Sequence, residues 1–319
     1  MNYSKSYLHS LLLQRPFLDA NLEKVLRLSS ILDDLFTDPR FSSKLVLKGG
    51  TAIALCFSGL KRLSVDIDLD YVGSLDPNLA FQDRSEILSK MENHLIDEGY
   101  RPIPAHHESY ALSSRAFAYQ NSSRNNDIIK IEINFLDRVH LFPSVQRTFS
   151  LFGQEHHVMV LSPEELFGSK IAALFDRTKP RDLYDLWQLT LNPKGTDSAK
   201  LRLCSLFYLV LDDVFFEPQS LLSRLDTLTY ADIRSELKPV LSKDDPFVLD
   251  TARSEVKAFL SSLLTLNEKE RAFLFSARQG NFDFSLLTED KGVEERMKDH
   301  PLIKWKIAQR KAPRFPNGH

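Results

Sequence analysis

The 319-residue sequence predicts an α+β fold, in which residues 1–195 mix strands and helices and residues 196–319 form a helical bundle. Three observations support this prediction. A short apolar strand ends in a pair of glycines and passes directly into a helix. A strand of alternating aspartates follows soon afterwards. From about Leu201 onward, apolar residues recur almost throughout at helical spacing, which indicates a second domain built from helices.

Composition indicates an ordinary globular protein, because 43% of the residues are hydrophobic and 26% are charged. The formal net charge is −2, so the overall charge does not indicate a nucleic-acid partner. Any contact with nucleic acid must come from local basic patches. Cys56 and Cys204 fit no metal-binding spacing and are interpreted as buried free thiols in a reducing cytosol. We expect no signal peptide and no membrane-spanning segment, and therefore a cytoplasmic protein.

The first motif begins with the apolar strand Leu45–Leu47, followed by Lys48, Gly49, Gly50 and Thr51. Two glycines allow a sharp turn and a close approach of the backbone to a ligand, because no side chain blocks it. A helix is predicted from Thr51 to Phe57. Its first amide groups would be free to bind phosphate oxygens.

The second half of this motif is Ser64–Asp70, in which aspartates alternate with branched apolar residues. The period of two places Asp66, Asp68 and Asp70 on one face of a strand. Neighbouring carboxylates raise one another's pKa, and a divalent cation is the usual remedy. An aspartate strand alone can be a solvated sheet face, but its place after the glycine turn favours a ligand-binding site over that interpretation. Lys61 and Arg62, in the preceding loop, could face phosphate or simply solvent.

This layout resembles the nucleotidyltransferase superfamily that includes polymerase beta. The resemblance implies a domain with a mixed sheet, in which the glycine turn cradles a nucleoside triphosphate and paired carboxylates hold two magnesium ions. A third carboxylate comes from a later strand of such enzymes. Glu132, on the predicted strand 128–135, is the best candidate, and a surface glutamate on an edge strand is the alternative.

Other elements follow from local patterns. Ser162 is predicted as a helix N-cap, Pro163 as the first helical residue and Glu165 as the end of a capping box. A second helix starts at Pro180, and Pro239 predicts an early end for one later helix. The further predictions are helices at 17–36, 77–100, 201–216, 232–241, 250–266 and 268–280, and a strand at 110–119. The stretch Lys304–Arg314 holds five basic residues and is either a disordered tail or an RNA-contacting patch.

The second motif runs from Lys170 to Leu186. Together with the first motif it resembles the AbiEii/AbiGii toxin family of bacterial nucleotidyltransferases. The pattern of that family is Lys-Leu-x-Ala-x-x-x-Arg-x-Lys-x-Arg-Asp-x-x-Asp-Leu, and this chain matches every named position except Ile171, which replaces Leu. The resemblance covers roughly residues 15–195, and the helical C-terminal half is similar only in general layout.

The resemblance implies roles for individual residues. Metal ligands would be Asp66, Asp68 and Glu132, for two Mg²⁺ ions with Mn²⁺ as the alternative ion. Catalytic residues would be Asp66, Asp68, Lys170 and Asp185. Nucleotide-binding residues would be Lys48, Gly49, Gly50, Thr51, Ser64, Arg177, Lys179, Arg181 and Asp182. A salt-bridged pair of helices is the structural alternative for the second motif.

The function implied is the toxin of a toxin–antitoxin or phage-defence system, with a cognate antitoxin as partner. Some members of such families transfer nucleotides from a triphosphate to the 3′ end of tRNA and block translation. One alternative is a nucleotidyltransferase that modifies a protein or a small molecule. The other is a catalytically inactive module that binds a triphosphate or sequesters a partner.

Overall fold

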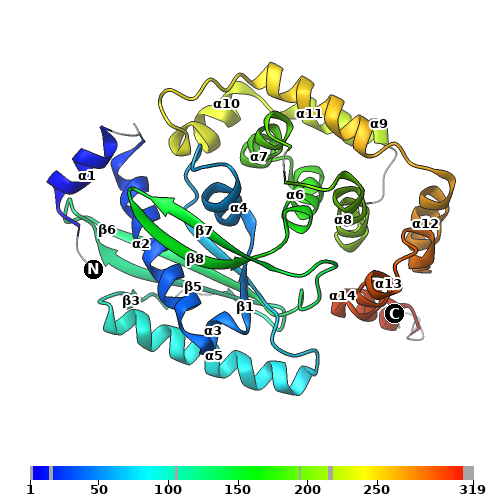
Figure 1. The fold of residues 1–319 in the computed structure, drawn as a ribbon, viewed down its shortest axis with the longest axis horizontal. Helices are drawn as coiled ribbons and strands as arrows, with labels where there is room; N and C mark the ends of the chain where they lie inside the picture. Colours follow the sequence, from blue (N-terminus) through cyan, green and yellow to red (C-terminus); the bar gives the residue numbers. More distant parts are fainter. Residues whose placement is uncertain (1–2, 14–16, 105–106, 194, 215–217, 312–319) are drawn as a thin grey trace, which may run out of the picture.

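The computed structural model describes residues 3–13, 17–104, 107–193, 195–214 and 218–311. Within these residues the strands form one eight-stranded mixed sheet, and helices surround it (Figure 1). The predicted α+β class is therefore confirmed. The strands are β1 (Leu45–Leu47), β2 (Asp66–Tyr71), β3 (Arg101–Pro102), β4 (His107–Glu108), β5 (Leu112–Gln120), β6 (Asn126–Asn134), β7 (Val145–Leu151) and β8 (Gln154–Val160).

The sheet places the two strands of the first motif at its centre. Its order is β3-β5-β6-β2-β1-β8-β7, with β4 paired to β5. β2 runs parallel to β6 and β1 parallel to β8, whereas the other pairs are antiparallel. The hairpin β7–β8 was not predicted. Its two-residue turn, Phe152 and Gly153, has φ values of 49° and 85°, which suit the tight turn of a twisted hairpin.

Apart from the helix predicted over 51–57, the helices predicted before residue 232 are present, although their ends move by a few residues. The helices are α1 (Lys5–Leu12), α2 (Asp19–Thr37), α3 (Pro39–Ser42), α4 (Gly49–Ala52), α5 (Pro77–Asp97), α6 (Pro163–Arg177), α7 (Pro180–Leu191), α8 (Ser198–Leu211), α9 (Pro218–Arg224), α10 (Tyr230–Asp232), α11 (Leu249–Leu263), α12 (Glu268–Arg278), α13 (Lys291–Asp299) and α14 (Pro301–Lys311). The segment predicted as a helix over 232–241 is instead a π-helical turn, η3 (Ile233–Leu237), followed by the 3₁₀ turn η4 (Lys238–Val240). Pro239 lacks an amide hydrogen, so a regular helix cannot continue there.

The start of α6 is partly as predicted. The Ser162 hydroxyl accepts a hydrogen bond from the Glu165 amide at 3.3 Å, which confirms the N-cap. The carboxylate of Glu165 does not close a capping box. It accepts from the Phe142 amide at 2.9 Å and from the Tyr208 hydroxyl, so it joins α6 to the segment after β6 and to α8. Burial raises the pKa of Glu165, although these donors oppose the rise.

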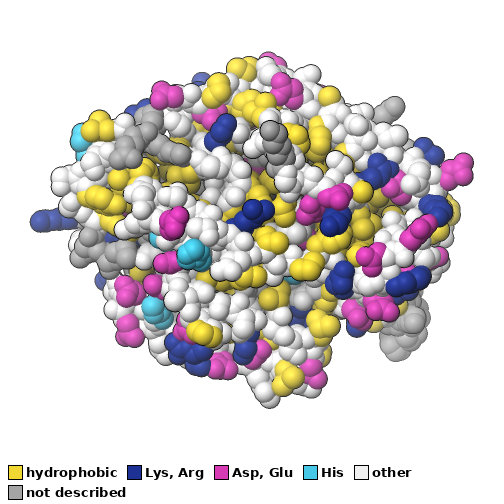
Figure 2. Space-filling view, in the orientation of Figure 1, with side chains coloured by type: hydrophobic (Ala, Val, Ile, Leu, Met, Phe, Trp, Pro, Cys, Tyr) yellow, Lys and Arg dark blue, Asp and Glu magenta, His cyan; other side chains and the backbone are white. Residues whose placement is uncertain are grey.

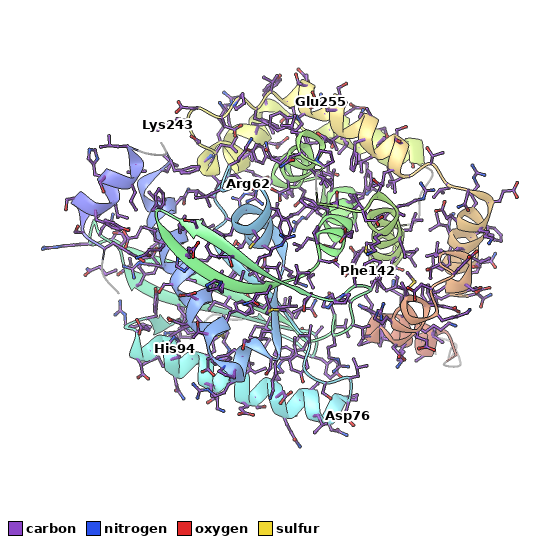
Figure 3. All side chains as sticks on the ribbon, viewed as in Figure 1. Arg62, Asp76, His94, Phe142, Lys243 and Glu255 are labelled. Carbon is purple, nitrogen blue, oxygen red and sulfur yellow. The ribbon has the colours of Figure 1, made fainter. Side chains whose placement is uncertain are left out.

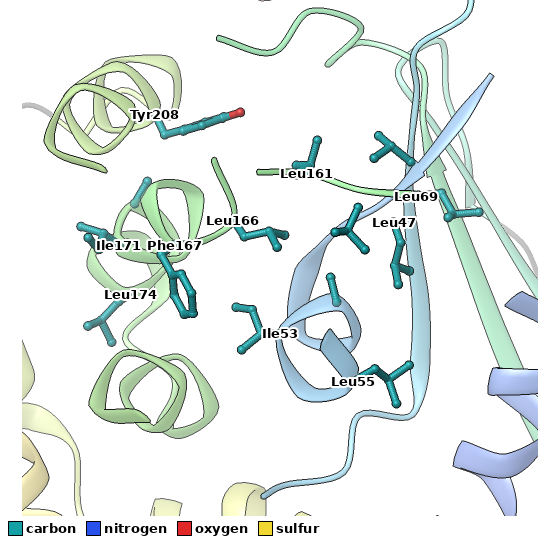
Figure 4. Packing of buried hydrophobic residues seen from close by; sticks show 14 of the residues in the cluster. Leu47, Ile53, Leu55, Leu69, Leu161, Leu166, Phe167, Ile171, Leu174 and Tyr208 are labelled. Carbon is teal, nitrogen blue, oxygen red and sulfur yellow. The ribbon is translucent and has the colours of Figure 1, made fainter. Parts of the chain in front are cut away.

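A continuous apolar core lies behind the first motif. Leu47 and Leu69 of the central strands, Ile53 of the helix after the glycine turn, and Leu166 and Ile171 of α6 belong to one buried cluster, in which Ile53 points toward α6 (Figure 4). All five are buried. The helix after the glycine turn is thus held between the sheet and α6, as burial of these apolar faces would favour. α8 packs on α6, and α11 packs on α7.

The C-terminal stretch is not the disordered tail that one reading proposed, because residues 301–311 form α14. Lys306 is buried and pairs with Asp213 at 2.5 Å, and Lys304 pairs with Asp299 at 2.8 Å. Residues 312–319, including Arg314, lie outside the described part of the chain.

The domain boundary near residue 195 stays a prediction. Cys204 is buried, Cys56 is half-buried, and both are free. In the described part of the chain, no helix is long and apolar enough to cross a membrane.

Candidate active site

The two glycines of the first motif are required by neighbouring side chains. Gly49 has φ of 70°, and a Cβ there would lie 2.5 Å from a carboxylate oxygen of Asp68. A Cβ on Gly50 would lie 2.6 Å from the Arg62 guanidinium and 3.2 Å from the Ser64 hydroxyl. The turn therefore packs directly on Asp68, Arg62 and Ser64. The sequence interpretation explained the two glycines by the approach of a ligand, but side chains of the protein itself also lie against them.

The helix after this turn is shorter than predicted and differs in type. α4 begins at Gly49, and a π-helical turn, η1 (Ile53–Phe57), follows it. Thr51 is buried, and its hydroxyl donates a hydrogen bond to the backbone carbonyl of Asp66. This bond ties the start of the helix to the first residue of β2. Thr51 thus has a structural contact in addition to its predicted part in nucleotide binding.

The aspartates of β2 share one face, as the alternation predicted, because Ile67 and Leu69 between them are fully buried. Burial raises the pKa of Asp68 to about 6, Asp66 and Glu132 add to the rise, and Lys48 opposes it. A buried carboxylate whose pKa is raised in part by acidic neighbours has the chemistry of a divalent-cation ligand.

Asp70 belongs to a different environment on the same face. It is buried, contacts Lys48, and lies 3.0 Å from Nε2 of His140. Burial alone would raise the pKa of Asp70, but Lys48 and His140 hold it below its usual range. Lys48 also lies 3.6 Å from Asp137. Lys48, a predicted nucleotide ligand, is therefore held next to the glycine turn by two acidic partners.

Glu132 lies beside Asp68, because the parallel pairing of β2 with β6 puts the two residues in register. β6 is an interior strand, so the edge-strand alternative is wrong. The Glu132 carboxylate contacts Lys130 at 2.8 Å. Within the described residues, no three acidic, histidine or cysteine side chains stand together as a ready-made metal site. Asp66 and Asp68 thus fit a cation as a pair of oxygen donors, and Glu132 is next to them but already bonded.

The second motif forms a chain of ion pairs at the junction of α6 and α7. Lys170 is buried, and its Nζ lies 2.8 Å from Asp182 and 3.2 Å from Asp185. Arg177 contacts Asp182 at 2.8 Å, and Arg62 contacts Asp185 through two nitrogens at 2.6 and 2.7 Å. These five side chains are called the ion-pair chain below.

The ion-pair chain joins three cations to two carboxylates, so it carries one positive charge in excess. Burial would raise the pKa of Asp182, but Lys170 and Arg177 lower it to about 2. Burial likewise opposes the charge of Lys170, and Asp182 and Asp185 outweigh it and raise the pKa of Lys170. Asp182 and Asp185 share one face of α7, as their spacing predicted. A buried ion pair is stable only when its partners are complete, so these residues depend on one another.

Arg62 was missed as a site residue. The loop position suggested contact with phosphate or solvent, and that interpretation was wrong, because the side chain is only 2% exposed. It lies between α4 and α7 (Figure 3) and joins the glycine turn to Asp185. No local pattern marks such a residue, since its partner is 123 positions away.

The predicted basic cluster of the second motif separates in the structure. Arg177 is about half exposed, and the charge of Asp68 acts on it and contributes to raising its pKa, to which the hydrogen bond with Asp182 contributes most. Lys179 contacts the Glu236 carboxylate at 2.9 Å, and Arg181 donates to the Glu236 carbonyl. Lys179 and Arg181 are therefore held by η3. Of the three, Arg177 is the residue whose charge reaches the acidic strand.

Comparison with known proteins agrees with this arrangement. The sequence model of the family described as "Nucleotidyl transferase AbiEii toxin, Type IV TA system" matches residues 30–277, which include both motifs. The fold is similar to that of the nucleotidyltransferase toxin MenT4 from Mycobacterium tuberculosis H37Rv, with a TM-score of 0.63 and 17% identity. The likeness covers 93% of this chain and 98% of that one. No curated protein sequence matches the chain.

Proposed function

Because this chain belongs to the AbiEii family of nucleotidyl transferase toxins of type IV toxin–antitoxin systems, we propose that it transfers a nucleotide from a nucleoside triphosphate to the 3′ end of tRNA. The observation that carries the site assignment is the contact between the glycine turn and Asp68. It puts the start of a helix and a strained carboxylate side by side. Triphosphate and acceptor must meet at such a point.

In the proposed reaction, the 3′ hydroxyl of the acceptor loses its proton to solvent and its oxygen forms a bond to the α-phosphorus. The bond from this phosphorus to the bridging oxygen breaks, and pyrophosphate leaves. Phosphate charge would be offset by Arg177, Lys48 and the amide groups at the start of α4. Lys170 lies deeper, and we propose that it acts on the phosphates from within the ion-pair chain, while Asp185 holds it in place.

Asp66 and Asp68 would hold Mg²⁺, for which carboxylate oxygens are the preferred protein ligands. Two ions, as in polymerase-beta-like enzymes, would also need Glu132, which must then leave Lys130. When bound, the metal would lower the pKa of the attacking hydroxyl and stabilise the leaving pyrophosphate. The raised pKa of Asp68 supports this assignment, because a cation would relieve the repulsion that contributes to it.

The acceptor is the least constrained part of the proposal. Basic and acidic side chains are interspersed over the face drawn in Figure 2, so no broad basic field marks an RNA surface there. Of the local patches named from the sequence, Lys61 is exposed, whereas Arg62 and Lys306 are buried in ion pairs. An RNA acceptor would therefore need a more specific contact than a general attraction to phosphate.

Labelled triphosphate, Mg²⁺ and total cell extract provide the test. We expect the label in the tRNA fraction, and we expect Asp68→Asn to reduce transfer by on the order of 100-fold or more, because it removes a charged oxygen donor. Asp97→Asn, at an exposed position of α5, is the matched control and should transfer normally.

Mg²⁺ should also raise the melting temperature of the wild type more than that of Asp68→Asn, since a ligand bound only to the native state stabilises it. If the label appears in protein or in small molecules, tRNA is not the acceptor, but the assignment of nucleotide transfer stands. Full activity of Asp68→Asn would reject the site.

A further inference from the structure

A largely apolar groove of about 650 Å³ lies between the start of α5, the segment before β5, and α14. Asp76, labelled in Figure 3, marks the start of α5, on the side of the molecule where Figure 1 places α13 and α14. The walls of the groove include Leu75, Tyr110, Leu136, Arg138, Leu302 and Trp305. A smaller hollow of about 360 Å³ shares Tyr110 and Arg138 with it.

Arg138 is the unusual member of this groove. Only 9% of the residue's surface is exposed, yet its Nε is buried without a hydrogen-bond partner. Within the described residues, its charge acts on the Tyr71 hydroxyl, and Nε is the guanidinium atom that is buried without a hydrogen bond. The other cations nearby are neutralised, since Arg84 contacts Glu108 at 2.6 Å and Lys304 contacts Asp299 at 2.8 Å. A buried cation without a partner is costly, and an anion from outside would complete it.

Two aromatic side chains flank this cation. Tyr110 is 67% exposed and Trp305 is 55% exposed, although both line the groove. Exposed aromatic rings beside an unpaired arginine form a surface on which nucleobases stack while the guanidinium binds a phosphate. The combination suits a short stretch of single-stranded nucleic acid better than a duplex, which would need several unpaired cations.

The groove lies next to the candidate active site. Leu136 and Arg138 line the groove, and Asp137 between them lies 3.6 Å from Lys48, the residue before the glycine turn. Residues 136–138 follow β6, which carries Glu132 beside Asp68. A nucleic-acid strand that crossed residues 136–138 would pass from the groove to the acidic face of β2.

We propose that this groove binds the single-stranded 3′ end of the RNA acceptor, with Arg138 on a phosphate and Tyr110 and Trp305 against bases. The proposal rests on the proposed function, because it takes RNA as the acceptor. A protein partner with apolar side chains and one carboxylate would fit the same chemistry, but it would have no reason to lie beside the acidic face.

The test uses an RNA hairpin with a single-stranded 3′ extension of four nucleotides and the same hairpin with a blunt end. Arg138→Gln and Trp305→Ala should each weaken binding of the extended hairpin about tenfold and leave the blunt hairpin unaffected. Arg138→Lys, which keeps the charge, should restore most of the affinity. Arg271→Gln and Phe275→Ala, both exposed on α12, are the matched controls and should bind normally.

Fluorescence gives an independent readout, because Trp187 is only 6% exposed and Trp305 dominates any change caused by RNA. The extended hairpin should quench the wild type, whereas Trp305→Phe should bind it without quenching. Binding of labelled triphosphate with Mg²⁺ should be the same in all variants, which also shows that they are folded.

The outcomes separate the two proposals. If the wild type labels RNA but Arg138→Gln and Trp305→Ala bind the extended hairpin normally, the groove proposal is overturned and the proposed function stands. If the wild type labels no RNA while these variants still lose affinity for the extension, the acceptor assignment fails and the groove remains an RNA site. If they lose only binding to the antitoxin protein, the groove is a protein-docking surface and the proposal is wrong.

Discussion

At the scale of single residues, Arg62 shows how one buried cation can hold two motifs together. Its guanidinium binds both carboxylate oxygens of Asp185, and both side chains are 2% exposed. We expect Arg62→Gln to cost about 3–5 kcal/mol of unfolding free energy, because it leaves a buried carboxylate without its main partner. Lys61→Gln, at the exposed neighbouring position, should change stability by less than about 0.5 kcal/mol. Urea unfolding of the two variants is the measurement, and a loss below about 1 kcal/mol in Arg62→Gln would show that Lys170 alone satisfies Asp185.

At the scale of elements, the glycine turn joins β1 to α4 and is shaped by β2. Gly49 and Gly153 both have positive φ, but a Cβ would meet Asp68 at Gly49 and nothing within 4 Å at Gly153. We expect Gly49→Ala and Gly153→Ala each to lose about 1–2 kcal/mol, because alanine is strained in this conformation. Only Gly49→Ala should also abolish nucleotide transfer, since its methyl group displaces the Asp68 carboxylate. Equal activity in the two variants, measured with labelled triphosphate, would mean that the position of Asp68 is not critical.

At the scale of the whole molecule, His300 connects the C-terminal helices to the sheet. It is 1% exposed, stacks edge-on against Phe207 of α8, and lies 3.7 Å from Asp137 beyond β6. Burial lowers the pKa of His300 to about 4, although Asp137 opposes the shift. The folded protein thus favours neutral imidazole, and the stability that His300 contributes is present above about pH 6.5 and lost as the pH falls to about 4. The loss should be about 3 kcal/mol, and the difference between the wild type and His300→Gln in unfolding experiments across this range measures it. Parallel pH profiles of the two proteins would contradict this account.

Local sequence determined the parts of the fold that depend on near neighbours. The strand–glycine–helix turn, the one-sided aspartates of β2, the N-cap at Ser162 and the helices α6 and α7 follow from spacing, backbone freedom and capping. The motif spacing was also sufficient to indicate the family that the sequence comparison then matched. These features are decided by residues within one or two turns of one another, so a linear pattern records them.

Tertiary structure alone decided which of these residues meet. The pairing of Arg62 with Asp185 and the register of Asp68 with Glu132 join segments that are far apart in the chain, and packing between distant segments also buries the Arg138 Nε without a partner. The same holds for Glu165, whose carboxylate accepts hydrogen bonds from Phe142 and Tyr208 and does not form the predicted capping box. The physical reason is that burial sets the energy of a charge or a polar group, and burial depends on packing between distant elements rather than on the neighbours along the sequence.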